Sequence, residues 1–165
     1  MTICLAAAVC RADDPDVGVK YPLPLPKPGH ISVVVVVGYT MSLWFVRNVI
    51  RQTERIAGKY GDDVGVELDF TPGESLQKYF RKDSAPVLNI PTVNLTRRQE
   101  RILELDSTGT PMMYIMDSAG IIRKIQDGWN GVDDADLGKK PWLIRSASEC
   151  IDRLQNKPPA AGVAD

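Results

Sequence analysis

The sequence predicts an α/β fold in which helices flank a central mixed sheet. Two apolar runs, 31–37 and 64–70, are separated by a long amphipathic segment, a pattern that predicts a parallel βαβ unit. Two later apolar runs, 112–116 and 121–125, are separated by the turn sequence Asp117-Ser118-Ala119-Gly120, which predicts a β-hairpin. A chain of 165 residues has the size of one domain with a substantial core.

The first half of the predicted domain is a strand, a long helix and a second strand. Ile31–Val37 is β-branched apart from Ser32, which is typical of a strand buried on both faces. After a loop at 38–42, Ser42 is a candidate N-cap for a helix that Gly61 would end. Residues at spacings of three or four predict the inner face of that helix, namely Val46, Val49, Thr53, Ile56 and Tyr60.

The second half contains shorter elements. We expect a short helix over 73–82 with Leu76, Tyr79 and Phe80 inward, and a short extended piece over Pro86–Ile90. Another helix is predicted over Leu95–Leu105, with Ile102 and Leu103 inward. A last helix begins at Pro141, with Cys150 close to a buried stripe that comprises Leu143, Ala147, Ile151 and Leu154.

The ends of the chain differ from its middle. Residues 1–12 are short and apolar, and small residues at Cys10 and Ala12 resemble the cleavage end of a secretory signal peptide, although its positively charged start is missing. Residues 13–30 form a proline-rich leader, expected to be an extended segment or a lid over the domain. The predicted domain covers 31–156, and 157–165 is predicted to be a disordered tail. We therefore expect a periplasmic or secreted protein, or a cytoplasmic one if 1–12 is not a signal.

Composition excludes several classes of function. The net charge is −1, with 20 basic and 21 acidic residues, so no nucleic acid or anionic membrane is expected as the main partner. No stretch is long enough to span a membrane. The chain has three cysteines and one histidine, His30, so we expect no metal site, no cofactor and no hydrolase triad.

Two stretches resemble the thioredoxin-like superfamily, in particular the thiol-disulfide oxidoreductases and redoxins of bacterial envelopes. Gly109–Gly120 is similar to the glycine, small residue, cis-proline, strand and acidic turn of those proteins. Val33–Tyr39 leading into the helix at Ser42 is similar to their first strand and active-site helix. The resemblance covers about 31–156 and implies a thioredoxin-like fold.

The resemblance also implies where a site would lie. Thr110-Pro111 matches the cis-proline element, whose exposed backbone groups pair with extended polypeptide in that superfamily. The plainer alternative is a loop end before a strand. Ser42-Leu43-Trp44-Phe45 stands where a C-x-x-C motif would be, with Ser42 at the attacking position and Phe45 at the resolving one. A serine hydroxyl cannot form a disulfide, so the chain has a degenerate active site.

Two functional hypotheses follow. The first is a redox-inactive domain that binds an extended peptide or protein partner through Tyr39, Met41, Leu43, Trp44, Thr110 and Pro111; the alternative for Leu43, Trp44 and Phe45 is that they simply cover the core. The second is a thiol-disulfide oxidoreductase or redoxin-type antioxidant protein that uses non-standard cysteines, either Cys150 or the pair Cys4 and Cys10. Cys150 is expected to be a buried, inert residue remote from Pro111. The sequence leaves the oligomeric state open.

Overall fold

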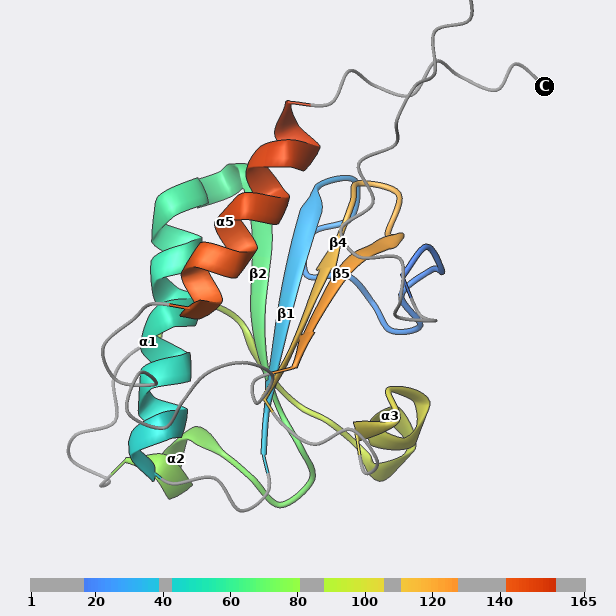
Figure 1. Cartoon of the computed structure of the whole chain (residues 1–165). Helices are drawn as coiled ribbons and strands as arrows, with labels where there is room; N and C mark the ends of the chain where they lie inside the picture. The colour runs from blue at the N-terminus through green and yellow to red at the C-terminus, as the bar shows by residue number, and fades with distance from the viewer. Residues whose placement is uncertain (1–16, 39–42, 81–87, 106–110, 128–141, 157–165) are drawn as a thin grey trace, which may run out of the picture.

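A central five-stranded sheet organises the molecule (Figure 1). The computed structural model describes residues 17–38, 43–80, 88–105, 111–127 and 142–156. The strand order is β3-β2-β1-β4-β5; β1 pairs parallel with β2 and antiparallel with β4. The pairs β2–β3 and β4–β5 are parallel and antiparallel respectively. The strands are β1 Ile31–Val37, β2 Val64–Phe70, β3 Thr92–Asn94, β4 Met112–Met116 and β5 Ile122–Asp127. The predicted mixed sheet, with its βαβ unit and hairpin, is confirmed.

Helices lie on both faces of this sheet (Figure 1). The long helices α1, Leu43–Tyr60, and α5, Trp142–Gln155, cover one face. A 3₁₀ turn, Gly61–Asp63, follows α1, and α2, Leu76–Tyr79, lies near the start of α1. On the other side is α3, Arg97–Ile102. Within the described ranges, no helix combines the length and hydropathy needed to cross a membrane.

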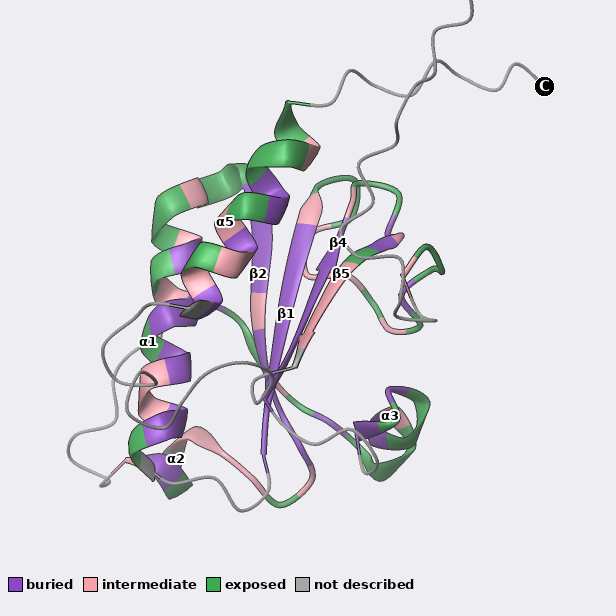
Figure 2. Ribbon diagram, in the orientation of Figure 1, coloured by how far each residue is buried: buried purple, intermediate pink, exposed green. Residues whose placement is uncertain are grey.

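The central strand β1 is buried along almost its whole length (Figure 2), and its side chains take part in two core clusters, one on each face of the sheet. Val33, Val34, Val35, Val36 and Val37 all have 0% exposure. Because side chains alternate along a strand, the odd-numbered valines pack towards α1 and α5, and the even-numbered ones pack in a second cluster on the opposite face. This is why an apolar run with no polar face could be recognised as a central strand.

The proline-rich segment Val17–His30 lies across the second face of the sheet. Tyr21 is 4% exposed and packs in the second cluster. Its backbone N–H donates to Gly120 O at 2.9 Å, and Ile122 N–H donates to Val19 O at 2.9 Å. The sequence predicts an extended segment or a lid for the leader 13–30. Its described residues, 17–30, consist mainly of turns and bends that close this face of the domain, and 13–16 lie outside the described residues.

The contact between this segment and β2 depends on a glycine. A Cβ added at Gly65 would lie 2.5 Å from Lys27 Cβ and 2.9 Å from Lys27 N. Lys27 is tied to the start of β2 as well, since its Nζ donates to Asp62 O at 2.5 Å. Gly65 therefore permits the segment to lie directly on the strand.

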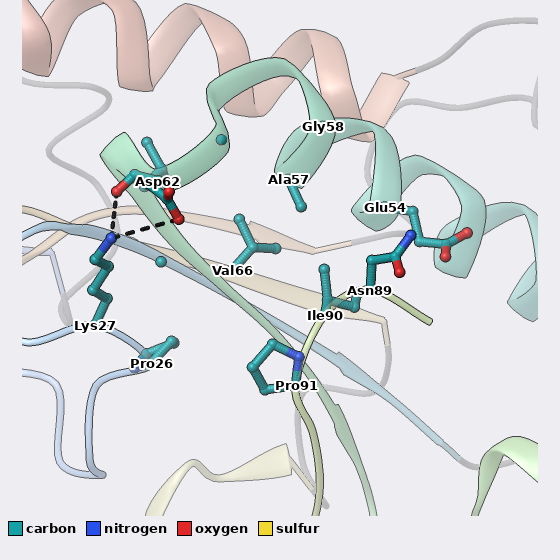
Figure 3. A pocket seen from close by; sticks show the side chains of 13 residues that line it. Pro26, Lys27, Glu54, Ala57, Gly58, Asp62, Val66, Asn89, Ile90 and Pro91 are labelled. Atoms are coloured by element: carbon teal, nitrogen blue, oxygen red, sulfur yellow. Dashed lines mark hydrogen bonds and ion pairs between the residues drawn. The ribbon is translucent and has the colours of Figure 1, made fainter. Parts of the chain in front are cut away.

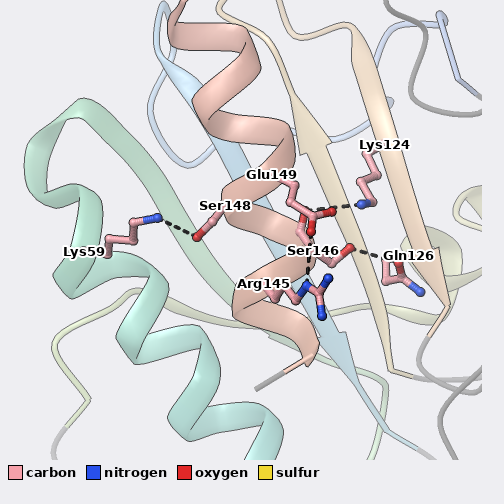
Figure 4. Close-up of polar contacts among 7 residues, drawn as sticks. All are labelled: Lys59, Lys124, Gln126, Arg145, Ser146, Ser148 and Glu149. Carbon is pink, nitrogen blue, oxygen red and sulfur yellow. Dashed lines mark hydrogen bonds and ion pairs between the residues drawn. The ribbon is translucent and has the colours of Figure 1, made fainter. Parts of the chain in front are cut away.

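Polar contacts join α5 to α1 and to the sheet (Figure 4). Gln52, 2% exposed in α1, accepts hydrogen bonds through Oε1 from Leu143 N at 2.8 Å and Ile144 N at 3.3 Å. It thereby satisfies orphan N–H groups in the first turn of α5. Lys59 Nζ donates to Ser148 Oγ at 2.8 Å, and Ser146 Oγ donates to Gln126 Oε1 on β5 at 3.0 Å. These bonds fix the position of α5 between α1 and the antiparallel hairpin.

Two predicted elements are misplaced. The extended piece predicted at Pro86–Ile90 is not a strand over 88–90, and 86–87 lie outside the described residues; the strand is β3, which begins after Pro91. The helix predicted from Leu95 begins instead at Arg97, because Thr96 and Gln99 form a capping box.

Two other helix predictions need smaller corrections. Ile102, predicted to face inward, is 45% exposed, while Leu103 is buried just beyond the end of α3. The helix predicted over 73–82 is only four residues long; Tyr79 is buried, and Leu76 and Phe80 are partly buried against the core. Ser42 and Pro141, the expected first residues of α1 and α5, lie outside the described residues.

Replacing Gly65 should test the contact with Lys27. Gly65→Ala places a methyl group against Lys27 and is expected to destabilise the domain by roughly 1 to 3 kcal/mol. The matched control is Gly58→Ala in α1, where an added Cβ meets nothing within 4 Å; it should stabilise by about 0.5 to 1 kcal/mol. Urea unfolding of both variants measures the difference. Equal effects of the two substitutions would contradict the contact.

Candidate functional site

The candidate site lies where β1 ends and α1 begins. In α/β folds, binding sites form at the carboxyl ends of parallel strands, where helix N-termini supply free N–H groups. β1 ends at Val37, β2 ends beside it at Phe70, and α1 starts at Leu43. Of the sequence-predicted site residues, Tyr39, Met41, Ser42 and Thr110 lie outside the described residues, and so does the side chain of Leu43.

The first turn of α1 contains two adjacent aromatic residues that differ in their exposure to solvent. Trp44 is 53% exposed, one of the large apolar side chains that remain open to solvent in the described part of the chain. Phe45 is 3% exposed and belongs to the core cluster beneath α1. Of the two alternatives for these residues, covering the core describes Phe45 and does not describe Trp44.

The start of β4 brings Pro111 to the same end of the sheet. Met112 pairs with Val36, one residue before the end of β1. Pro111, which precedes Met112, is buried and therefore lies beside the end of β1, from which the chain continues towards α1. The register thus places Pro111 at the end of the sheet where β1 and β2 end. That it meets the residues leading into α1 stays a prediction, since 39–42 lie outside the described residues.

A close contact joins the ends of β1 and β2. Thr71 N–H donates to Val37 O at 3.0 Å. A Cβ at Gly38 would lie 1.7 Å from Thr71 Oγ1, so only glycine fits at this position. The buried Thr71 hydroxyl has no hydrogen-bond partner among the described residues. This contact fixes where the chain leaves β1 for the candidate site.

Side chains of the segment around α2 hold it against α1. Arg47 Nε donates to Tyr79 O at 2.9 Å, and its guanidinium lies 5.3 Å from the centre of the Phe80 ring. The Tyr79 hydroxyl donates to a Glu74 carboxylate oxygen. Burial and the Glu74 carboxylate raise the pKa of Tyr79, which therefore keeps its proton. The first half of α1 is thereby packed against a second element close to the candidate site.

Two neighbouring carboxyl groups, the buried Asp69 and the partly buried Glu67, lie on β2 at the level of this site. Asp69 is 2% exposed, and the Glu67 carboxyl forms a hydrogen bond with it. Asp69 pairs with Val36, which in turn pairs with Met112, so it lies in the same row of the sheet as the residue after Pro111. Burial, and then the negative charge of Glu67, raise the pKa of Asp69 to about 8. Burial also raises the pKa of Glu67.

Two tyrosines share the face of the sheet that holds these carboxyl groups. Tyr21 and Tyr114 pack together with ring centres 5.5 Å apart. Burial, followed by the charge of Asp69, raises the pKa of Tyr21, whose hydroxyl has no hydrogen-bond partner among the described residues. The sequence analysis missed this cluster, although the alternation of Glu67 and Asp69 with apolar residues in β2 was the available signal.

The remaining candidates for chemistry lie elsewhere. Cys150 is 1% exposed in the core beneath α5, as predicted, and His30 is exposed before β1. Within the described ranges, no group of three or more His, Cys, Asp or Glu residues is placed to hold a metal ion. The described part of the site therefore offers an exposed indole, a proline and backbone groups, with a protonatable carboxyl pair below.

The order and pairing of the strands and helices give a thioredoxin-like fold, as the resemblance in the sequence implies. Among solved structures, the chain is similar to a putative thiol:disulfide interchange protein DsbE from Chlorobium tepidum, with a TM-score of 0.55 and 14% identity over 82% of this chain and 96% of that one. It is also similar to a DsbF homologue from Corynebacterium diphtheriae, with a TM-score of 0.54 and 14% identity over 77% of this chain and 73% of that one. No protein-family model and no curated protein matches the sequence.

The carboxyl pair predicts an unusual pH dependence of stability. The pKa of Asp69 is higher in the folded state than in the unfolded chain. The contribution of Asp69 to the free energy of unfolding is therefore greatest below about pH 4 and is lost as the pH rises to about 8. Asp69→Asn removes this loss and should stabilise the domain by several kcal/mol at pH 8.5, with little effect at pH 4, because one pKa unit corresponds to about 1.4 kcal/mol. Urea unfolding at both pH values measures the difference.

Asp63→Asn, at an exposed carboxylate just before β2, is the matched control and should leave the pH dependence unchanged. A wild-type stability that does not fall between pH 4 and 8.5 relative to Asp69→Asn would contradict the prediction.

Proposed function

We propose that this protein is a redox-inactive thioredoxin-fold domain that binds an extended peptide or a protein partner beside Pro111 and the start of α1. The observation that carries the proposal is the first turn of α1. At the positions that the resemblance assigns to a C-x-x-C motif, the chain has an exposed Trp44 and a buried Phe45, and no cysteine. A thiol reaction has no nucleophile there, whereas a binding surface has an aromatic anchor.

The chemistry of this surface favours a polypeptide as the ligand. Indole side chains contribute a large apolar area at interfaces and are enriched among residues that carry binding energy. The position before Pro111, by resemblance, exposes backbone groups that can pair with an extended chain as an added strand would. An extended segment that pairs with Thr110 and buries Trp44 would use both features.

Replacing Trp44 tests the proposal. Trp44→Ala should weaken binding of the partner at least tenfold, because truncation of an aromatic anchor removes most of its buried apolar contact. The Tm should stay close to that of the wild type, since half of this side chain is already exposed. The measurement is affinity capture from the native compartment, followed by titration of the captured partner.

Arg51→Ala, at another exposed residue of α1, is the matched control and should bind as the wild type does. Unchanged binding by Trp44→Ala, or its loss of the folded state, would count against the proposed surface.

The second candidate function is a thiol-disulfide oxidoreductase or redoxin-type antioxidant protein with non-standard cysteines. The two similar solved structures support this general class of activity, because one is described as a putative thiol:disulfide interchange protein and the other as a DsbF homologue. The burial of Cys150 disfavours it, since a reactive thiolate needs access to its substrate. Cys4 and Cys10 lie outside the described residues.

We also propose that the protein is exported, either to the periplasm or outside the cell. The support is the signal-like sequence of residues 1–12. Cleavage after Ala12 would remove Cys4 and Cys10 and leave Cys150 as the remaining cysteine. The mass of the protein purified from its native compartment identifies the form that has to be assayed.

A redox assay separates the two candidate functions. We expect the mature protein to show no insulin reduction and no peroxide consumption above background, and Cys150→Ser to behave identically, because the described thiol is buried. An authentic C-x-x-C thioredoxin serves as the positive control. Turnover that disappears in Cys150→Ser would overturn the proposal and establish the oxidoreductase.

A further inference from the structure

A groove of about 430 Å³ follows the edge of β2 at the end of the molecule opposite the candidate site (Figure 3). Its floor is Val64–Val66, the first residues of the strand. The last turns of α1 form one wall, and the segment that contains Pro26 and Lys27 forms the other. We call this feature the edge groove.

The floor of the edge groove presents backbone groups that no described strand uses. β3 pairs with β2 only over Leu68–Phe70. On that side of β2, Leu68 N–H donates to Pro91 O at 3.1 Å and Phe70 O accepts from Leu95 N–H at 2.8 Å, whereas Thr71 N–H points the opposite way, to Val37. Because the backbone direction alternates along a strand, the N–H and C=O of Val66 point into the edge groove.

Pro91 explains why β3 does not continue along this edge. A proline has no N–H to donate, and its ring fixes φ, so it is found at the beginnings of strands. Upstream of β3, Asn89, Ile90 and Pro91 line one end of the edge groove and leave its floor uncovered. The place where a neighbouring strand would lie is therefore open in the described part of the chain.

The wall formed by α1 consists of small residues. Ala57, Gly58 and Gly61 follow Glu54 at intervals of three, four and seven, so all four lie on one side of the helix and of the turn that follows it. An added Cβ at Gly58 would meet nothing within 4 Å. A main chain can therefore approach the floor without displacing a side chain of this wall.

The charge at the edge groove is negative. Lys27 Nζ is engaged by the carbonyl oxygen of Asp62 at 2.5 Å and by its carboxylate at 4.0 Å. Glu54 lies at the other end of the groove, beside Asn89 (Figure 3), and forms no ion pair with a described residue. A cationic side chain placed beside Glu54 would supply the missing partner.

We propose that the edge groove binds an extended, lysine- or arginine-containing segment of a partner polypeptide, which adds to the sheet as a strand beside the first half of β2. The N–H and C=O of Val66, which bond to no other described residue, provide the main-chain hydrogen bonds, and Glu54 selects the positive charge. The floor, Val64–Val66, has room along β2 for about three residues of an extended chain, at roughly 3.3 Å per residue. This site is separate from the surface around Trp44 and does not depend on it.

The probe for this site is the peptide acetyl-Val-Lys-Val-Lys-Val-amide. On binding, the Val66 amide should exchange its hydrogen at least tenfold more slowly, while the Glu67 amide, which faces β1, should not change. Gly58→Gln fills the edge groove from the wall and should weaken binding at least tenfold, whereas Gly58→Ala should bind within twofold of the wild type. Glu54→Gln should weaken binding a few-fold, and Trp44→Ala should have no effect on it.

Two further peptides test the chemistry of recognition. The peptide with every backbone nitrogen methylated and the peptide with glutamate in place of lysine should both fail to protect Val66. The proposal is overturned if Gly58→Gln binds as the wild type does, if the methylated peptide binds equally well, or if the affected amides surround Trp44 instead. It is also overturned if Val66 becomes protected at high protein concentration without peptide, since the occupant is then a second copy of this chain.

Discussion

Burial of β1 on both faces is the constraint on which the rest of the structure depends. Five consecutive valines with no exposed surface cannot be covered from one side, because their side chains alternate between the two faces. α1 and α5 cover one face, and the other is covered by α3, its flanking residues and the N-terminal segment around Tyr21. The proline-rich segment is therefore an integral part of the hydrophobic core, and the molecule has two apolar layers that share one strand.

The elements with strong periodicity were predictable from the sequence, and the short ones were not. β1, β2, β4 and α1 follow from apolar runs or helical spacing, and the structure places them within a residue of the predicted bounds. β3 has only three residues, one of them partly buried, so no apolar pattern marks it. The start of α3 depends on the local capping bonds of Thr96 and Gln99, and the apolar pattern around Leu95 and Leu103 extends beyond the helix itself.

The location of the candidate site could be predicted from the sequence, but the groups that surround it could not. Glycine, proline and the order of the elements predict that Pro111 and the start of α1 meet, and the register of β4 with β1 places Pro111 beside the end of β1. The alternation in β2 places Glu67 and Asp69 on one face of the strand, but the burial of Asp69 depends on the N-terminal segment that covers this face, which is a tertiary property. The same holds for the edge groove, since it exists only because α1, β2 and the residues around Lys27 come together. Local sequence patterns predict helices and strands, whereas grooves and buried clusters depend on how those elements pack together.

The capping of α5 by Gln52 has a consequence for how the domain assembles. The N–H groups of Leu143 and Ile144 are satisfied by a side chain that lies 91 and 92 residues earlier in the chain. The first turn of α5 therefore gains this stabilisation only after α1 has formed and docked, so the two helices are coupled in a single cooperative unit. During synthesis Oε1 of Gln52 would lack these two donors until the last part of the domain has formed. A fragment that ends before Trp142 would leave the Gln52 amide beneath an uncovered apolar face, which makes the C-terminal helix the step that completes folding.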